Sequence, residues 1–154
     1  MIKLRFAALA ALLTLSACSS GHEPGKAGIE VENAWARLPA LPDRPGAAYF
    51  TLRNYGAGAV LTGVQSPRVQ RIELHDEAMT GSGMGGMMHM TPLTEVAISQ
   101  GSSAAFQPGG KHAMLFDMDP KLKEGGQLPL TFVFRDGHRI DAQAKLVAVG
   151  APAP

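Results

Sequence analysis

After residue 17, no stretch of this 154-residue chain sustains the i, i+3, i+4, i+7 spacing of apolar residues that marks an amphipathic helix. Short runs rich in β-branched and aromatic residues alternate instead with turn signals. The clearest turn signals are Asn54-Tyr55-Gly56, Pro108-Gly109-Gly110, Glu124-Gly125-Gly126 and Asp136-Gly137. Many short strands at close spacing are typical of a β-sandwich or a β-barrel. The sequence therefore predicts an all-β fold.

The candidate strands lie in one continuous region, residues 28–149, which we predict to be a single domain. They span residues 29–36, 47–52, 60–64, 69–75, 96–99, 103–106, 111–116, 128–134 and 139–149. Before this region, residues 18–27 have the composition of a flexible tether, and after it residues 150–154 are predicted to be a disordered tail.

The first 17 residues have the pattern of a secretory signal peptide. Lys3 and Arg5 precede a short apolar run that is far below the roughly 20 residues of a membrane-spanning helix. The following Leu15-Ser16-Ala17-Cys18 resembles the bacterial lipoprotein processing box, which implies cleavage before Cys18 and acylation of its thiol. The alternative is an ordinary signal peptide with a chance cysteine. Either reading places the protein in the periplasm or cell envelope.

A lipid on Cys18 would be the only link of the domain to a membrane. Ser19 and Ser20 follow the cysteine with no Asp, a pattern that favours the outer membrane of a Gram-negative cell. Cys18 is also the chain's single cysteine, so a lipidated protein has no disulfide and no thiolate ligand. This excludes a blue-copper electron-transfer site and a thiol–disulfide exchanger. The net charge is near neutral, with 14 basic and 13 acidic residues, so the composition does not indicate a nucleic-acid-binding protein.

Methionine is unevenly distributed, because seven of the eight methionines fall between Met79 and Met118. Thioether sulfur suits a soft ion such as Cu(I), and imidazole completes such a shell well. Two histidines, His89 and His112, lie in the same stretch, and His75 lies just before it. Core-filling methionines would be scattered along the chain. The concentration therefore indicates copper binding.

The segment His112-Ala113-Met114 lies in a candidate strand, where alternate side chains share a face. His112 and Met114 would thus project from one face, with Ala113 and Leu115 facing the core. Taken alone, a single His-X-Met is more often a surface histidine beside a packed methionine. The clustering of the other soft ligands is what favours a metal site here.

Two further candidate ligands come from the preceding segment. In the candidate strand that ends at His75, Ile72 and Leu74 share a buried face and His75 lies on the other. Met90 ends a glycine-rich stretch, Gly81–Met90, which we expect to be a loop that folds a thioether over the site. His75, Met90, His112 and Met114 would give four-coordinate Cu(I), with Met87, Met88 and His89 as possible auxiliary ligands. The competing interpretation is a low-complexity loop without function.

The spacing of these residues resembles that of the PCuAC family of periplasmic copper chaperones. The family motif is His, ten residues, Met, 21 residues and His-X-Met; here Met90 and His112 enclose 21 residues, but His75 and Met90 enclose 14. The four additional residues leave open whether Met90, Met88 or Met87 supplies the loop sulfur, and the spacing to His112 favours Met90. Other similar segments are Ala34–Arg37, Ala47–Phe50, Glu73–His75, Pro108–Leu115, Leu122–Gly125 and Pro129–Phe132.

The resemblance implies a cupredoxin-like Greek-key β-barrel that holds one Cu(I) per domain and is not an enzyme. It further implies delivery of copper to the dinuclear centre of cytochrome c oxidase subunit II, with a Sco-type copper protein as a second partner. An alternative is a copper-buffering or resistance lipoprotein without a dedicated client, which the surplus methionines favour. A third is a metal-free envelope lipoprotein that binds a protein or another ligand.

Overall fold

The computed structural model describes residues 28–80 and 87–154, which form ten strands. The strands are β1 Ile29–Arg37, β2 Gly46–Asn54, β3 Ala59–Gln65, β4 Val69–Thr80, β5 Met87–Leu93, β6 Val96–Ile98, β7 Ser103–Phe106, β8 Lys111–Met118, β9 Gln127–Phe134 and β10 Arg139–Val147. The predicted all-β, single-domain fold is confirmed. The signal peptide, the tether and Cys18 lie outside the described residues. Within the described part, no helix is long and apolar enough to span a bilayer.

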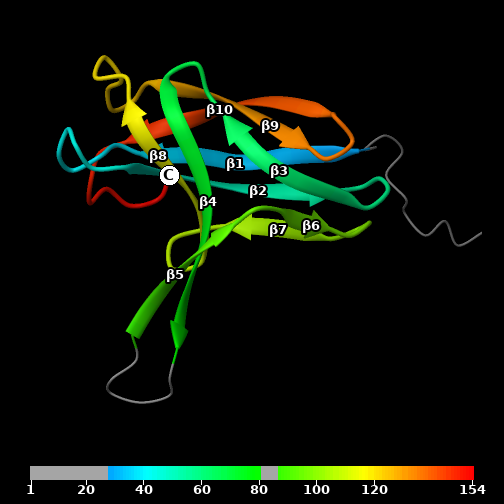
Figure 1. Cartoon of the computed structure of the whole chain (residues 1–154). Coiled ribbons are helices and arrows are strands. Elements are labelled where there is room, and N and C mark those ends of the chain that lie inside the picture. Colours follow the sequence, from blue (N-terminus) through cyan, green and yellow to red (C-terminus); the bar gives the residue numbers. More distant parts are fainter. Residues whose placement is uncertain (1–27, 81–86) are drawn as a thin grey trace, which may run out of the picture.

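The strands follow the order β5-β4-β8-β2-β1-β10-β9-β3-β6, with β7 also paired to β2. Neighbours such as β4 and β8, or β8 and β2, are far apart in sequence, so the chain crosses over the ends of the sheet. β1 pairs in parallel with β10, whereas β1 and β2 are antiparallel. β3 and β4 also lie side by side, so the sheet curls into a nearly closed barrel from which the β4–β5 hairpin projects (Figure 1).

The core follows from the period of two along each strand. In β9, the buried positions alternate at Leu128, Leu130, Phe132 and Phe134. Phe132 meets Phe50 of β2 edge to face at 4.7 Å between ring centroids, and such aromatic pairs add to the free energy of burial. Leu74, Ala113 and Leu115 are buried in the same core, and Ile72 packs against it. The predicted core faces of β4 and β8 are thus confirmed.

The prediction of a loop over Gly81–Met90 was wrong at its end, because residues 87–93 form strand β5. The sequence of β5, Met-Met-His-Met-Thr-Pro-Leu, shows no alternation of apolar and polar residues. Its residues 89–92 are exposed and do not pack on the core. Pro92 also argues against a central strand, but β5 lies at an edge, where proline is tolerated. β4 extends to Thr80 to pair with it.

A second, small apolar cluster forms between Trp35, Tyr49 and Val147. The Trp35 and Tyr49 rings lie 4.4 Å apart, and burial raises the pKa of the Tyr49 hydroxyl. Arg37 donates a hydrogen bond from Nη2 to the carbonyl of Ala151, at 3.0 Å. This bond joins the end of the chain to β1, and the disorder expected over residues 150–154 stays a prediction.

Asn54 is a buried polar side chain, 1 % exposed, at the end of β2. Its amide nitrogen donates to the carbonyls of Ala57, at 2.7 Å, and Ile98, at 3.0 Å, and its oxygen accepts from the Gly56 amide, at 3.0 Å. Removing this side chain leaves these backbone groups without partners, each at a cost of about 1 kcal/mol or more. We expect Asn54→Ala to lower the free energy of unfolding by about 3 kcal/mol.

Urea unfolding at equilibrium measures this difference, provided that the slope with denaturant concentration is unchanged. A suitable control is Gln127→Ala, because Gln127 is exposed at the start of β9 and should shift stability by less than about 0.5 kcal/mol. Equal stability of Asn54→Ala and the control would contradict the role of Asn54.

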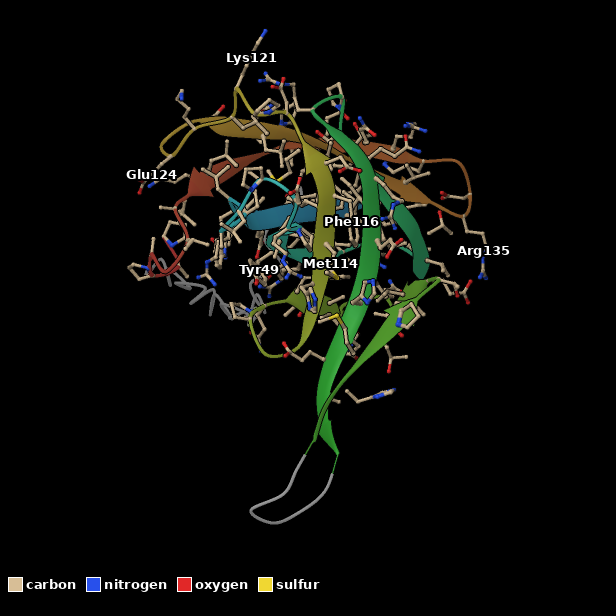
Figure 2. The ribbon with its side chains drawn as sticks, turned by 60° about the vertical axis from the view of Figure 1, so that its left-hand side comes forward. Tyr49, Met114, Phe116, Lys121, Glu124 and Arg135 are labelled. Atoms are coloured by element: carbon tan, nitrogen blue, oxygen red, sulfur yellow. The ribbon has the colours of Figure 1, made fainter. Side chains whose placement is uncertain are left out.

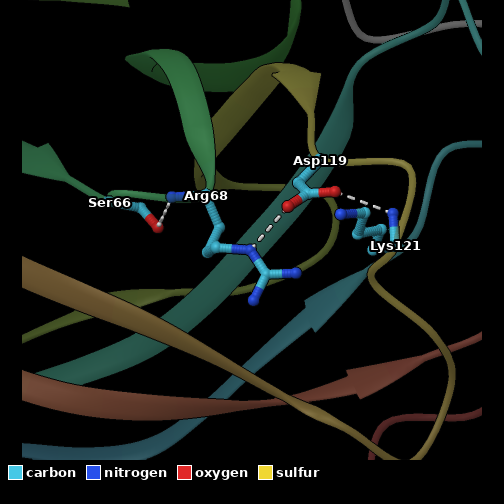
Figure 3. Close-up of polar contacts among 4 residues, drawn as sticks. All are labelled: Ser66, Arg68, Asp119 and Lys121. Atoms are coloured by element: carbon cyan, nitrogen blue, oxygen red, sulfur yellow. Dashed lines mark hydrogen bonds and ion pairs between the residues drawn. The ribbon is translucent and has the colours of Figure 1, made fainter.

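Asp119 joins the turn before β4 to the segment after β8 (Figure 3). Arg68 donates from Nε to Asp119 Oδ2 at 2.8 Å, and the Lys121 backbone N–H donates to Oδ1 at 2.8 Å. The Arg68 backbone N–H in turn donates to Ser66 Oγ at 3.2 Å. The Lys121 N–H first, and then the Arg68 guanidinium, lower the pKa of the Asp119 carboxyl.

A carboxyl whose pKa is lowered by folding contributes stability above its unfolded pKa and loses it as the pH falls through the folded pKa. We therefore expect Asp119→Asn to be less stable than the wild type at pH 7, with a gap that closes as the pH falls below about 4. Urea unfolding of both proteins at several pH values measures the gap, with Asp43→Asn in an exposed turn as control. A gap that persists unchanged in acid would rule out this linkage.

Candidate metal centre

Strands β4 and β8 bring two of the predicted ligands directly opposite each other. Their antiparallel register pairs His75 with His112, and Glu73 with Met114. Directly opposed residues on two strands have Cβ atoms about 5 Å apart. Because side chains alternate along a strand, these four lie on the face of the sheet opposite to the core.

The two imidazole rings are nearly parallel, with centroids 6.0 Å apart and planes inclined by 24°. Both are largely shielded from solvent: His112 is 6 % exposed and the His75 side chain 12 %. A metal–imidazole bond of about 2 Å places a ring centroid roughly 3 Å from the ion, so two rings on one ion lie up to about 6 Å apart. The observed separation of 6.0 Å lies at the upper end of this range, which corresponds to two imidazoles on nearly opposite sides of one ion.

His112 has one ring nitrogen fixed by the backbone. Its Nδ1 lies 2.9 Å from the Gly110 carbonyl oxygen, in the turn that precedes β8. A carbonyl oxygen can only accept, so Nδ1 carries the proton and donates. Nε2 of His112 is then left with a free lone pair.

In His75 the hydrogen-bonded ring nitrogen is Nε2, whereas in His112 it is Nδ1. Nε2 of His75 lies 3.2 Å from Glu73 Oε2, while its Nδ1 is buried and has no hydrogen-bond partner. The pKa of the Glu73 carboxyl is lowered, mainly by this hydrogen bond and further by the Arg71 guanidinium. An ionised carboxylate can only accept, so Nε2 of His75 is the donor.

Met114 lies in the middle of this face. It pairs with Glu73 of β4 on one side and with Ala47 of β2 on the other, and it is half-buried. Figure 2 shows Met114 on β8, below Phe116 and to the right of Tyr49 in this view. Its thioether thus shares a strand face with the two imidazoles, as the His-X-Met spacing predicted.

Met90 lies farther from the histidines than a loop folded over the site would bring it. In the β4–β5 hairpin it pairs with Glu77, whereas His75 pairs with Pro92. Met90 therefore lies on the same face as His75 but is displaced along the hairpin by two residues, which is about 7 Å. Its side chain is 44 % exposed. Its role as a ligand stays a prediction.

The auxiliary candidates Met87, Met88 and His89 also belong to β5. His89 is exposed and pairs with Ala78, so by alternation it lies on the opposite face of the hairpin from Met90. Their roles stay predictions, and Met84 lies outside the described residues.

The donor set available here is soft. Within residues 28–80 and 87–154, no three His, Cys, Asp or Glu side chains come together in a way that could hold a metal ion. The Met114 sulfur lies on the same face as His75 and His112, and a site that includes it favours a soft cation.

Two features of this centre were not predicted from the sequence. Glu73 precedes His75 by two residues, so strand alternation could have placed it beside the ring. No sequence pattern predicts the contact between the Gly110 carbonyl and His112, because the direction of that carbonyl depends on the conformation of the turn.

The family comparison gives a match over residues 29–146, to the family described as "Putative lipoprotein LpqE-like". The chain belongs to the LpqE-like family. A similar curated protein is the uncharacterized protein RP573 of Rickettsia prowazekii (strain Madrid E), 29 % identical over 118 residues, 73 % of this chain. This LpqE-like protein spans 63 % of the length of that relative.

Solved structures of copper-related domains resemble this LpqE-like protein. The copper-bound PCuAC domain from PmoF2 has a TM-score of 0.65 at 22 % identity, covering 83 % of this chain and 99 % of that domain, a likeness that shows the fold. DR1885 of Deinococcus radiodurans in its Cu(I) form has a TM-score of 0.53 at 28 % identity, covering 76 % of this chain and 78 % of its own. The resemblance to the PCuAC family is thus confirmed.

Proposed function

We propose that this LpqE-like protein is a Cu(I) carrier of the cell envelope that delivers copper to the dinuclear site of cytochrome c oxidase subunit II. One observation carries the proposal: His75 and His112 each have one ring nitrogen held by an oxygen acceptor and the other free. Histidines that bind metals almost always donate their other ring N–H to a carboxylate or a carbonyl. Glu73 and Gly110 supply these two acceptors.

The chemistry of the face suits the cuprous ion. Two neutral imidazoles and the Met114 sulfur bind a soft ion without adding charge, and Met90 on the adjoining hairpin is the predicted fourth ligand. The site is open on the side of Met90, where the side chain is exposed. A partner's ligands would replace those of the carrier from that side. Such a protein carries an ion and catalyses no reaction.

The relatives support copper as the cargo. DR1885, 28 % identical, is known in a Cu(I)-bound form, and the PmoF2 domain is known in a copper-bound form. The family description supports attachment of this chain to an envelope membrane through the predicted lipid on Cys18. We propose that this membrane is the outer membrane. A Sco-type copper protein is the further partner we propose.

Titration of the processed protein with Cu(I), followed by X-ray absorption at the copper edge, tests the binding. We expect one ion per domain, bound by two nitrogen and two sulfur atoms. An oxygen-only shell would refute the assignment. The absence of uptake would instead favour the metal-free envelope lipoprotein.

Delivery needs a separate experiment. Cu(I)-loaded protein mixed with an apo fragment of oxidase subunit II should lose its copper to the fragment. After oxidation of the loaded fragment by one electron with added ferricyanide, the mixed-valence dinuclear centre should appear in the visible spectrum. A second reaction with a Sco-type protein present shows whether both partners are required. Retention of all copper by the carrier would argue against delivery.

A copper-buffering lipoprotein without a client is the second candidate. It is favoured by the run Met87-Met88-His89-Met90 on the edge strand β5, which offers more soft donors than one site uses. Binding of clearly more than one Cu(I) per domain, together with no transfer to subunit II, would support buffering over delivery.

A further inference from the structure

We propose that Glu73 is a positioning residue of the metal centre, which holds the His75 ring so that Nδ1, and not Nε2, binds the ion. The inference rests on the proposed function. It makes the two histidines unequal, because His112 offers Nε2 while His75 offers Nδ1.

The first step is the contact between Glu73 and His75. They occupy alternate positions of β4, so their side chains lie on one face, and His75 Nε2 donates to Glu73 Oε2 over 3.2 Å. The bond fixes the tautomer and the rotation of the ring together. Nδ1 of His75 is then a lone-pair donor that is buried without any partner.

Buried polar atoms without a partner are rare, and each requires a reason such as an ion that is not present. Nδ1 of His75 belongs to the ring whose centroid is 6.0 Å from that of His112. A bound ion would satisfy Nδ1 and the free Nε2 of His112 together. Binding through Nε2 of His75 would instead require breaking the bond to Glu73.

The second step is the support of Glu73 itself. Arg71, two residues before it, donates from Nη1 to its other oxygen, Oε1. The guanidinium of Arg71 lies over the ring of Phe116, its register partner on β8, at 3.9 Å from the ring centroid. Both carboxylate oxygens of Glu73 are thus hydrogen-bonded, one to His75 and one to Arg71. The cation–π contact with Phe116 in turn holds the Arg71 guanidinium in place. The row Phe116, Arg71, Glu73 and His75 therefore positions the ligand.

The experiment compares Glu73→Ala with the wild type, using protein labelled with ¹⁵N in its histidines. Cu(I) is diamagnetic, so the imidazole nitrogens can be followed by NMR before and after loading. In the wild type we expect apo His75 to carry its proton on Nε2, and Cu(I) to shift Nδ1 of His75 and Nε2 of His112. In Glu73→Ala, His75 should become a mixture of tautomers, and Cu(I) affinity should fall about 10- to 100-fold.

Two further variants separate positioning from a structural effect. Glu73→Gln keeps an oxygen that accepts from Nε2–H, so most of the affinity and the tautomer should return. Glu95→Ala removes a carboxylate in the β5–β6 connection that pairs with Arg135, the residue after β9. This variant lies away from His75 and His112 and should bind Cu(I) like the wild type. Thermal unfolding of the apo proteins checks that the variants are folded.

The outcomes distinguish the two proposals. Coordination of His75 through Nε2, or an unchanged tautomer and affinity in Glu73→Ala, would overturn the positioning role while leaving copper binding in place. Direct binding of the ion by the Glu73 carboxylate would overturn it as well. Failure of the wild type to bind Cu(I) would instead refute the proposed function.

Discussion

Replacing His112 and Met114 together by alanine is expected to abolish high-affinity Cu(I) binding. The two residues share a face of β8, and His112 lies opposite His75 in the register with β4. The double variant leaves His75 with no second imidazole and removes the sulfur in the middle of the site. Affinity should fall at least 100-fold. Competition with a chromogenic Cu(I) chelator measures the change.

A matched control removes the same residue types away from the site. His138 is exposed in the turn between β9 and β10, and Met118 packs against the core at the far end of β8. The variant His138→Ala/Met118→Leu should keep wild-type affinity, because leucine conserves most of the methionine volume. Wild-type stoichiometry and affinity in His112→Ala/Met114→Ala would refute the assigned site.

Phe132→Ala is expected to cause the largest loss of stability. Phe132 is fully buried in β9 and meets Phe50 edge to face, and Phe50 in turn stacks on Phe106 at 4.3 Å. Truncating a buried phenylalanine removes its transfer free energy and leaves a cavity, at a combined cost of about 3–5 kcal/mol. Domains of this size unfold with about 5–15 kcal/mol in total, so much of the stability would be lost.

Urea unfolding of the apo protein provides the measurement. The control is Leu41→Ala, since Leu41 is a large apolar side chain that is 62 % exposed in the β1–β2 connection. We expect the control to change the free energy of unfolding by less than about 0.5 kcal/mol. A loss below about 1 kcal/mol for Phe132→Ala would mean that the barrel interior repacks around the missing ring.

Much of the fold could be predicted from the chain because each strand faces one core. Leu128, Leu130, Phe132 and Phe134 alternate with less buried residues, and that period of two identifies β9 without a partner. β5 could not be identified in this way. The hairpin projects from the barrel, so neither apolar alternation nor a core contact marks most of residues 87–93, and pairing with β4 alone makes them a strand (Figure 1).

Only part of the candidate metal site could be predicted from the sequence. Alternation placed His112 and Met114 on one face and His75 on the outer face of its strand. The sequence does not state that β4 pairs with β8, because residues 81–110, with the three strands β5, β6 and β7, lie between the two. It also does not give the direction of the Gly110 carbonyl or the contact between Arg71 and Phe116.

By itself, the sequence determined the strand-rich character, the soft donor types and the face on which each donor lies, since these depend on composition and on local periodicity. The tertiary structure alone decided that His75 and His112 lie opposite each other, which nitrogen of each ring is free, and that Met90 lies on the exposed hairpin. These features depend on strand register and on hydrogen bonds between β4, β8 and the turn before β8. No local pattern encodes such long-range pairing.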